Sequence, residues 1–370
     1  MTPRATPPFR AEHVGSLIRP AALIGARDAW LKGRFDAAEL ARVEDRCIRD
    51  AVALQERAGL QGVSDGEFRR DSWRDGFFNN VEGFSADRDQ ADFEFSLADG
   101  TRRKAAPVPR VVGKLKRRRG IATGEFQFLQ SVATAMPKIT LPAPSVMHFF
   151  RGAAAIGRSI YADVREFMAD VSAIYREELA DLARLGCRYV QFDEVALPIL
   201  CDPDVADLIR RRGEEPRETI QLYIDALNDA LRDRPKGMTV CVHMCRGNVD
   251  NGIASGGYEP IAEQAFATLN VDGFLLEYDT SRAGGFEPLR MVPRDKTVAL
   301  GLVSTKRAEI EPVDMLRARI DEAGRYLPLD QLCLCPQCGF ASGFRTARLT
   351  LDDEERKLAH LVAVARSVWG

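Results

Sequence analysis

The sequence predicts an α/β protein of the (β/α)8 TIM-barrel class on the basis of three observations. Eight short runs rich in β-branched and apolar residues are bounded by turn residues. Long amphipathic segments alternate with these runs, which is the pattern of repeated parallel βα units. The residues suited to chemistry fall at the ends of the runs in both halves of the chain, as catalytic groups do in barrels. An open doubly wound sheet is the alternative architecture.

The predicted elements follow one another along the whole chain. Strands are expected at 12–16 (EHVGS), 62–66 (GVSDG), 138–144 (KITLPAP), 189–194 (YVQFDE), 239–245 (TVCVHMC), 273–279 (GFLLEYD), 297–303 (TVALGLV) and 332–336 (LCLCP). Helices are expected at 36–59, 162–185, 215–233, 312–326 and 351–368. In 162–185, apolar residues including Phe167, Val171 and Ile174 recur at three- and four-residue steps, so one face can pack on a sheet.

The segment 85–135 interrupts this rhythm with polar and basic sequence. We predict that it is an excursion from a single barrel domain of residues 1–370, because no repeat or low-complexity linker divides the chain. Within the excursion, residues 114–119 read KLKRRR. This run could attract the acidic tail of a polyglutamate ligand, or it could be a solvated face.

The composition favours a small-molecule enzyme in a reducing compartment. The 52 Lys and Arg nearly balance the 54 Asp and Glu, so a net charge of -2 creates no general field for nucleic acid or a membrane surface. No apolar run approaches the roughly 20 residues of a membrane span, and the N-terminus lacks the apolar core of a secretory signal. We therefore expect a cytoplasmic protein, in which eight cysteines favour metal or redox chemistry over disulfides.

The strongest local pattern is CVHMC at the end of the fifth predicted strand. Alternation along a strand places Cys241, His243 and Cys245 on one face, so a metal at the barrel mouth could contact the last two. Cys241 would then lie one layer deeper. After the eighth strand, CPQCGF supplies Cys338 in a loop with proline and glycine, which can turn its sulfur back over the mouth.

The sixth predicted strand contributes Glu277, an acid in otherwise apolar sequence. Burying a carboxylate is costly unless a cation pairs with it. Two thiolates, an imidazole and a carboxylate suit zinc in softness and charge. The predicted zinc ligands are His243, Cys245, Glu277 and Cys338. Glu277 could instead form a salt bridge with Arg282, Asp279 is a rival ligand on the same strand face, and Cys335 with Cys338 could be a redox or core pair.

Together these residues resemble the zinc site in the catalytic half of cobalamin-independent methionine synthase, and more closely that of its short single-barrel relatives. The resemblance extends over about residues 9–370. It implies that His243 and Cys245 of an HxC motif, the strand acid Glu277 and Cys338 of a CG motif bind a catalytic zinc ion. It also implies two small-molecule substrates, a thiol amino acid and a methyl donor such as a reduced folate.

Three further matches concern the thiol amino acid. The sequence VGS resembles the first-strand loop whose backbone and serine hold the homocysteine carboxylate, which implies this role for Gly15 and Ser16. Glu67 in SDGEFRRD and Asp193 in QFDEVAL resemble the two acids that hold its amino group. An α-ammonium group needs anionic partners in a dry pocket, which agrees with these roles. The two acids could instead cap helices or pair with the arginines that follow Glu67.

The resemblance implies methylation of a thiol, giving methionine where the thiol is homocysteine. Coordination to zinc removes the proton of a thiol, which otherwise has a pKa near 8.5, and leaves sulfur as the nucleophile. The nitrogen that releases the methyl group of a folate must be protonated, so an acid is required. The candidates are His13, Asp193, Glu194 and Lys306. Lys306 stands where the long enzymes carry a histidine, and it could equally bind a carboxylate of the donor.

Two other functions fit the same residues. One is zinc-dependent alkyl transfer to a different thiol or from a different electrophile, such as epoxide opening by a thiol cofactor. The other is a non-catalytic protein that binds zinc or a thiol ligand. Phe149 and Phe150, after the third predicted strand, are candidates for stacking on a pterin ring and equally for the core.

Overall fold

A computed structural model of the chain describes residues 4–370 apart from 90–93, 97–100, 106, 158 and 249–253. The helices are α1 (Ala21–Leu31), α2 (Ala37–Ala58), α3 (Asp75–Asn80), α4 (Thr123–Val132), α5 (Val146–Phe149), α6 (Val164–Arg184), α7 (Ala196–Ile199), α8 (Pro203–Arg211), α9 (Pro216–Ala230), α10 (Glu259–Ile261), α11 (Val313–Ala323) and α12 (Leu351–Trp369). The strands are β1 (Gly62–Val63), β2 (Val81–Asp89), β3 (Glu94–Ser96), β4 (Arg102–Lys104), β5 (Val108–Arg117), β6 (Met136–Pro137), β7 (Ile139–Pro142), β8 (Tyr189–Asp193), β9 (Thr239–Met244), β10 (Gly273–Glu277), β11 (Thr297–Val303) and β12 (Leu332–Pro336). None of the described helices combines the length and the apolar composition that crossing a bilayer requires.

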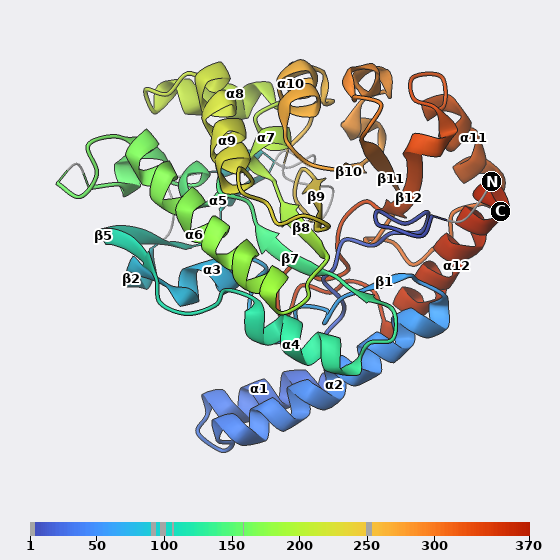
Figure 1. The fold of residues 1–370 in the computed structure, drawn as a ribbon, viewed down its shortest axis with the longest axis horizontal. Coiled ribbons are helices and arrows are strands. Elements are labelled where there is room, and N and C mark those ends of the chain that lie inside the picture. Colours follow the sequence, from blue (N-terminus) through green and yellow to red (C-terminus); the bar gives the residue numbers. More distant parts are fainter. Residues whose placement is uncertain (1–3, 90–93, 97–100, 106, 158, 249–253) are drawn as a thin grey trace.

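Parallel strands in chain order build the wall of a barrel (Figure 1). Six of them pair in the order β12, β11, β10, β9, β8 and β7, while β6, which leads into β7, pairs with β1. Ala11 bridges Leu334 of β12, and Leu17 N donates to Gly66 O (3.1 Å) beyond β1. The segment 11–17 therefore closes the ring, and the predicted TIM-barrel class is confirmed.

The strand predicted at 12–16 is wrong in detail. Residues 12–16 form no strand, and the nearest bridge is at Ala11, directly before them. Gly15 has a φ of 132°, and a Cβ at that position would lie 2.5 Å from Thr140 Cγ2. The chain therefore leaves the extended conformation to approach β7, which the apolar pattern alone does not indicate.

Helices cover the outside of the barrel, and the ring of neighbours closes where α12 contacts α2. The predicted helices are confirmed as α2, α6, α9, α11 and α12. Capping residues in the local sequence determine where these helices begin and end. In α2, a capping box joins Asp36 and Glu39, and Gly59 ends the helix in the left-handed conformation (φ 90°).

The core has two parts. A large cluster fills the space between the sheet and the helices. A small one lies inside the barrel and consists of Val14, Tyr189, Cys241, Leu275, Ala299, Cys333 and Cys335. Cys241 therefore lies in the interior layer, as the alternation of CVHMC predicts, and Cys335 packs there too.

The excursion differs from the predicted boundaries of 85–135. It begins directly after α3 with β2, which pairs antiparallel with β5, and β3 pairs antiparallel with β4. The contacts of β2 with α3 and of β5 with α6 place this antiparallel structure beside the barrel, at the left of Figure 1. The later part of the predicted segment is α4, which packs between α2 and α6 as an ordinary barrel helix. The sequence pattern did not predict this helix, which follows the basic run at 114–119.

Candidate active site

A cavity of about 670 Å³ lies where the barrel strands end. Loops after the first strand segment, β1, β8, β9 and β12 contribute to it, so residues from both halves of the chain meet. The predicted site residues in its lining are Ser16, Glu67, Asp193, His243, Cys245 and Cys338. His13, Gly15, Glu277 and Lys306 are not among the residues that line it.

Three of the four predicted zinc ligands lie together. The ligand atoms of His243, Cys245 and Cys338 are all within 4.8 Å of one another, and the two Sγ atoms are 3.6 Å apart. His243 Nδ1 contacts the carbonyl oxygen of Leu275 (3.1 Å), which requires the proton on Nδ1 and leaves the lone pair on Nε2. Nε2 is buried, with no hydrogen-bond partner among the described residues. This donor set fits tetrahedral zinc.

The two thiols of this group are free and electrostatically unequal. The hydrogen bond between the two sulfurs and the nearby His243 lower the pKa of Cys245 well below its ordinary value, although burial opposes this. The same hydrogen bond and burial raise the pKa of Cys338. One thiolate beside an imidazole is thus already favoured, as metal ligation requires.

Glu277 lies outside this group and is held by cations. Its Oε1 pairs with Arg282 and lies 3.8 Å from Lys306 Nζ, and its Oε2 accepts a hydrogen bond from Arg246 N (2.6 Å). Burial alone would raise the pKa of Glu277, but the three cations lower it. Asp279, the rival ligand, is also outside the group. The salt bridge weighed for Glu277 is therefore present, and its role as a zinc ligand stays a prediction.

Glu67 and Asp193 bring two buried carboxylates to the cavity. Glu67 Oε1 accepts from Thr140 Oγ1 (2.7 Å) and lies 3.6 Å from Arg70 Nη1, whereas Oε2 is buried without a partner among the described residues. Asp193 Oδ1 accepts from Gln191 Nε2 (2.8 Å). Burial and the nearby Glu67 raise the pKa of Asp193 to about 7. An ammonium group would offset both the burial and the mutual repulsion.

Two backbone features shape this part of the site. Glu67 has a φ of 61°, a left-handed conformation that costs a residue with a side chain about 1–3 kcal/mol. A Cβ on Gly339 would lie 1.9 Å from Ser16 Oγ, so the loop after β12 approaches Ser16 only because residue 339 is glycine. Strain and close contact of this kind are typical of functional sites.

The other candidate acids lie away from the lining. His13 Nε2 contacts Gly62 O (3.2 Å), and burial with the charge of Lys138 lowers its pKa well below the ordinary value, so its ring is neutral at pH 7. Burial raises the pKa of Glu194 to about 7, but its side chain faces Ser145 and the backbone of the following helix. Lys306 reaches Glu277 instead. Asp193 is the candidate acid that lines the cavity.

Part of the lining carries no signal in the sequence. Trp73, Arg74 and Lys104 line the cavity, and Phe150 does too, whereas Phe149 is fully buried core. The guanidinium of Arg74 lies 5.3 Å from the ring centroid of Phe150. No local pattern marks these cations, because Arg74 precedes α3, Lys104 belongs to β4, and only the tertiary fold brings both to the cavity.

The KLKRRR run does not line the cavity. Lys114 pairs with Glu166, and Arg117 pairs with Glu178 and Asp181 (both 2.5 Å). These ion pairs favour the structural interpretation of the run over an interaction with an acidic ligand.

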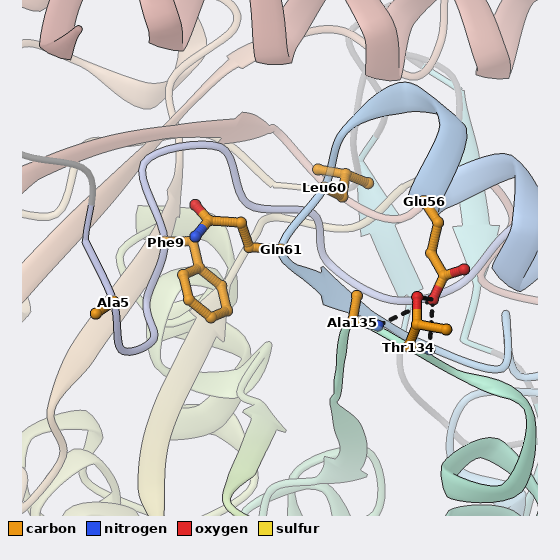
Figure 2. A pocket seen from close by; sticks show the side chains of 7 residues that line it. All are labelled: Ala5, Phe9, Glu56, Leu60, Gln61, Thr134 and Ala135. Atoms are coloured by element: carbon orange, nitrogen blue, oxygen red, sulfur yellow. Dashed lines mark hydrogen bonds between the residues drawn. The ribbon is translucent and has the colours of Figure 1, made fainter.

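A second hollow, of about 420 Å³, lies at the opposite ends of β1 and β6 (Figure 2). Glu56 is its one carboxylate, and Figure 2 shows it bonded to Thr134 and Ala135. Those hydrogen bonds outweigh the effect of burial and lower the pKa of Glu56. With its acid already satisfied, at the barrel face that usually serves stability, this hollow offers no chemistry.

Comparison with known proteins identifies the family of the chain. The family model for the catalytic domain of cobalamin-independent synthase matches residues 9–367. The uncharacterized protein YxjG of Bacillus subtilis is 40% identical over 99% of this chain and 96% of its own length, and YxjH of the same organism is 37% identical over 98% and 95%. A structure from Listeria monocytogenes, provisionally described as a vitamin-B12-independent methionine synthase, has a TM-score of 0.76 at 28% identity and covers 99% of this chain and 100% of its own. A B12-independent methionine synthase from Shewanella sp. W3-18-1, in complex with selenomethionine, shares the fold with a TM-score of 0.74 at 23% identity over 97% of both chains. The chain therefore belongs to the cobalamin-independent methionine synthase family, whose catalytic domain it spans.

Proposed function

We propose that this chain methylates the sulfur of a thiol amino acid, with homocysteine as the acceptor and a methylated reduced folate or similar compound as the donor. The observation that supports this is the convergence of three metal-type side chains and two buried acids in one cavity. The metal-type side chains suit a sulfur atom, and the acids suit the ammonium group of the same substrate.

His243 Nε2 and the sulfurs of Cys245 and Cys338 would hold zinc, with Glu277 as the proposed fourth ligand. A bound zinc ion lowers the pKa of a coordinating thiol and so supplies a sulfur nucleophile at neutral pH. The Leu275 carbonyl fixes the His243 ring in the tautomer that this ligation needs. To reach the metal group, Glu277 would have to leave Arg282, so exchange between these two positions is part of the proposal.

The amino acid end of the substrate would lie between the two acids and the first-strand loop. Glu67 Oε2 has no partner among the described residues and would accept from the ammonium group, as would Asp193. Ser16 and the backbone at Gly15 would hold the carboxylate. The selenomethionine bound to the Shewanella protein supports an amino acid of the methionine type as the ligand.

Asp193 is also the best-placed acid for the leaving nitrogen of the donor. It lines the cavity, and burial with the nearby Glu67 raises its pKa to about 7, so it can take up a proton at neutral pH before the ammonium group binds beside it. His13 and Lys306 would act only through other groups, because neither lines the cavity.

The test combines metal analysis with product analysis. The purified chain should contain about one zinc per molecule, and with homocysteine and methyltetrahydrofolate, in mono- and polyglutamate forms, it should produce methionine detectable by mass spectrometry. Chelation should abolish turnover, and zinc should restore it. A metal-free preparation with full activity would refute the zinc chemistry. Tight homocysteine binding without turnover on any folate would refute the donor and favour alkyl transfer from another electrophile.

A further inference from the structure

The loop after β9 and the loop after β12 meet at the mouth of the barrel, although their strands are not neighbours. β10 and β11 lie between β9 and β12 in the sheet, so strand pairing does not join the two loops. Each loop carries one thiol of the metal group, Cys245 after β9 and Cys338 after β12. Contacts other than strand pairing must therefore hold the two sulfurs 3.6 Å apart.

Gln337, which directly precedes Cys338, links these two loops through its side chain. It is only 1% exposed. Its Nε2 donates to Oδ1 of Asn248 (3.1 Å), three residues after Cys245. Asn248 Nδ2 in turn donates to the carbonyl oxygen of Gly339 (2.7 Å), directly after Cys338. Asn248 therefore bonds to the residues on both sides of Cys338.

The same glutamine also holds the loop after β11, which carries Lys306. Thr305 N donates to Gln337 Oε1 (2.7 Å). Thr305 Oγ1 lies within hydrogen-bond distance of Gln337 Oε1 (3.2 Å) and of Gly339 O (3.1 Å). Three loops that follow three different strands thus converge on one buried amide. We call Gln337, Asn248 and Thr305 the loop clamp.

The two ends of the loop clamp fix the direction of its hydrogen bonds. A backbone N–H can only donate and a carbonyl can only accept, so Thr305 N requires the oxygen of the Gln337 amide, and Gly339 O requires the nitrogen of the Asn248 amide. The remaining pair, Gln337 Nε2 and Asn248 Oδ1, then matches a donor with an acceptor. Turning either amide over would leave a polar group unpaired, so the network has one arrangement.

We propose that Gln337 and Asn248 are positioning residues, which fix the loops after β9, β11 and β12 so that Cys245 and Cys338 stay at the separation that one metal ion requires. The proposal rests on the proposed function in that this ion is zinc. Two thiols on separate loops would otherwise lose conformational freedom when they bind a common ion, and the loop clamp reduces that cost. Groups that orient metal ligands typically change metal affinity by about 10- to 100-fold.

Zinc affinity tests the loop clamp. Gln337→Met keeps the length of the side chain but removes the amide, and it should bind zinc about 10- to 100-fold more weakly in competition with a chromogenic chelator. Gln331→Met is the matched control, because Gln331 is a buried glutamine at the other end of β12 whose Nε2 donates to Pro293 O and Lys296 O (both 2.8 Å). Both variants should lower the melting temperature, since each leaves buried backbone groups without a partner, but only Gln337→Met should lose zinc affinity. Wild-type zinc affinity in Gln337→Met, or an equal loss in Gln331→Met, would overturn the proposal.

Asn248 provides a variant with less risk to folding, because its side chain is half-buried. Asn248→Ala breaks both bonds to the loop after β12, and its loss of zinc affinity should be smaller than that of Gln337→Met because Thr305 still holds Gln337. In the double variant, the loss should be smaller than the product of the two single losses, since both changes break the same link. A loss equal to the product would mean that the two residues act independently, which would overturn the loop clamp.

A reagent for neighbouring thiols separates the loop clamp from the zinc chemistry. Phenylarsine oxide forms two As–S bonds with a close pair of thiols and releases water, so it reports the proximity of Cys245 and Cys338 without zinc or His243. The zinc-free wild-type chain should bind it more tightly than Gln337→Met does, and Cys338→Ser is the control that cannot form both bonds. A wild-type chain that bound the arsenical more tightly than the variant but bound no zinc would refute the proposed function and support the loop clamp. Equal binding of the arsenical by the wild-type chain and Gln337→Met would overturn the loop clamp alone.

Discussion

Cys241 and Cys245 lie four residues apart at the end of one strand, yet their thiols have opposite properties. Cys241 packs in the interior cluster, where burial raises its pKa well above the ordinary value. Cys245 lines the cavity, and Cys338 and His243 lower its pKa. Depth along the barrel axis, and not residue type, therefore decides which cysteine can act as a ligand.

The charged residues follow the same division. In the interior, Glu12 accepts from Phe9 N (2.7 Å) and lies 3.5 Å from Lys138 Nζ, which also donates to His13 O and contacts Gln191 Oε1 (3.3 Å). At the mouth, Glu67 keeps an oxygen without a described partner. The protein itself satisfies Glu12 and Lys138 in the interior, whereas Glu67 at the mouth keeps one oxygen for a ligand.

The largest effect that would test this comparison is on metal content. Cys245→Ser and Cys338→Ser should each lower zinc affinity by more than about 100-fold, the upper figure for groups that merely orient a ligand. Cys241→Ala should retain zinc, because its thiol belongs to the interior cluster. Mass-spectrometric metal analysis after dialysis measures both. Zinc loss in Cys241→Ala would place the site deeper than proposed.

The next effect is on stability and concerns the interior. Lys138→Met removes the cation that Glu12 faces and leaves a buried carboxylate without compensation. We expect a loss of about 3–5 kcal/mol in the free energy of unfolding, measured by urea denaturation. Zinc content of the folded variant should stay at the wild-type value. A stable variant that lost zinc would contradict the separation of the two regions.

A smaller effect tests the acids at the mouth. Glu67→Gln and Asp193→Asn should each weaken homocysteine binding by about 1–3 kcal/mol through loss of a charged hydrogen bond, measured by calorimetry. 4-Mercaptobutyrate, which lacks the amino group, is the control ligand, and its affinity should not fall in either variant. Unchanged homocysteine binding in both variants would refute the ammonium site.

Much of this fold follows from local sequence. Apolar strands and amphipathic helices repeat often enough that seven of the eight predicted strands and all five predicted helices lie where the pattern indicates, although α1 was not predicted. The prediction of the first strand was wrong because Gly15 turns the chain out of the extended conformation. Alternation of side chains along the chain also explains why His13 does not line the cavity. Val14 and Ser16 flank the same cavity, while His13 precedes them and contacts Gly62 instead.

The site was predictable only where its chemistry is carried by strand ends. His243, Cys245 and Cys338 meet because parallel strands end at one face. The salt bridge of Glu277 with Arg282 was among the alternatives that the sequence offered, but its contacts with Arg246 and Lys306 could not be foreseen, because these two residues come from different loops. Lys104 depends on antiparallel pairing in the excursion, which its polar sequence does not specify, and Arg74 lies before α3, outside any strand.

The smallest expected effect concerns Glu354, a buried acid that faces neither the interior cluster nor the cavity. Its Oε2 accepts from Ile18 N (2.9 Å), and burial raises its pKa to about 8 from an ordinary 4.5. A raised carboxyl pKa contributes stability that is complete below pH 4.5 and is lost as pH rises to about 8. Glu354→Gln keeps the hydrogen-bond acceptor but does not titrate. The free energy of unfolding of the variant, minus that of the wild type, should therefore increase between pH 5 and pH 9. A gain of at least about 1.4 kcal/mol, equal to one pKa unit, is expected from urea denaturation. The partly exposed neighbour Glu355→Gln is the control, and an equal gain there would assign the effect to surface charge instead of burial.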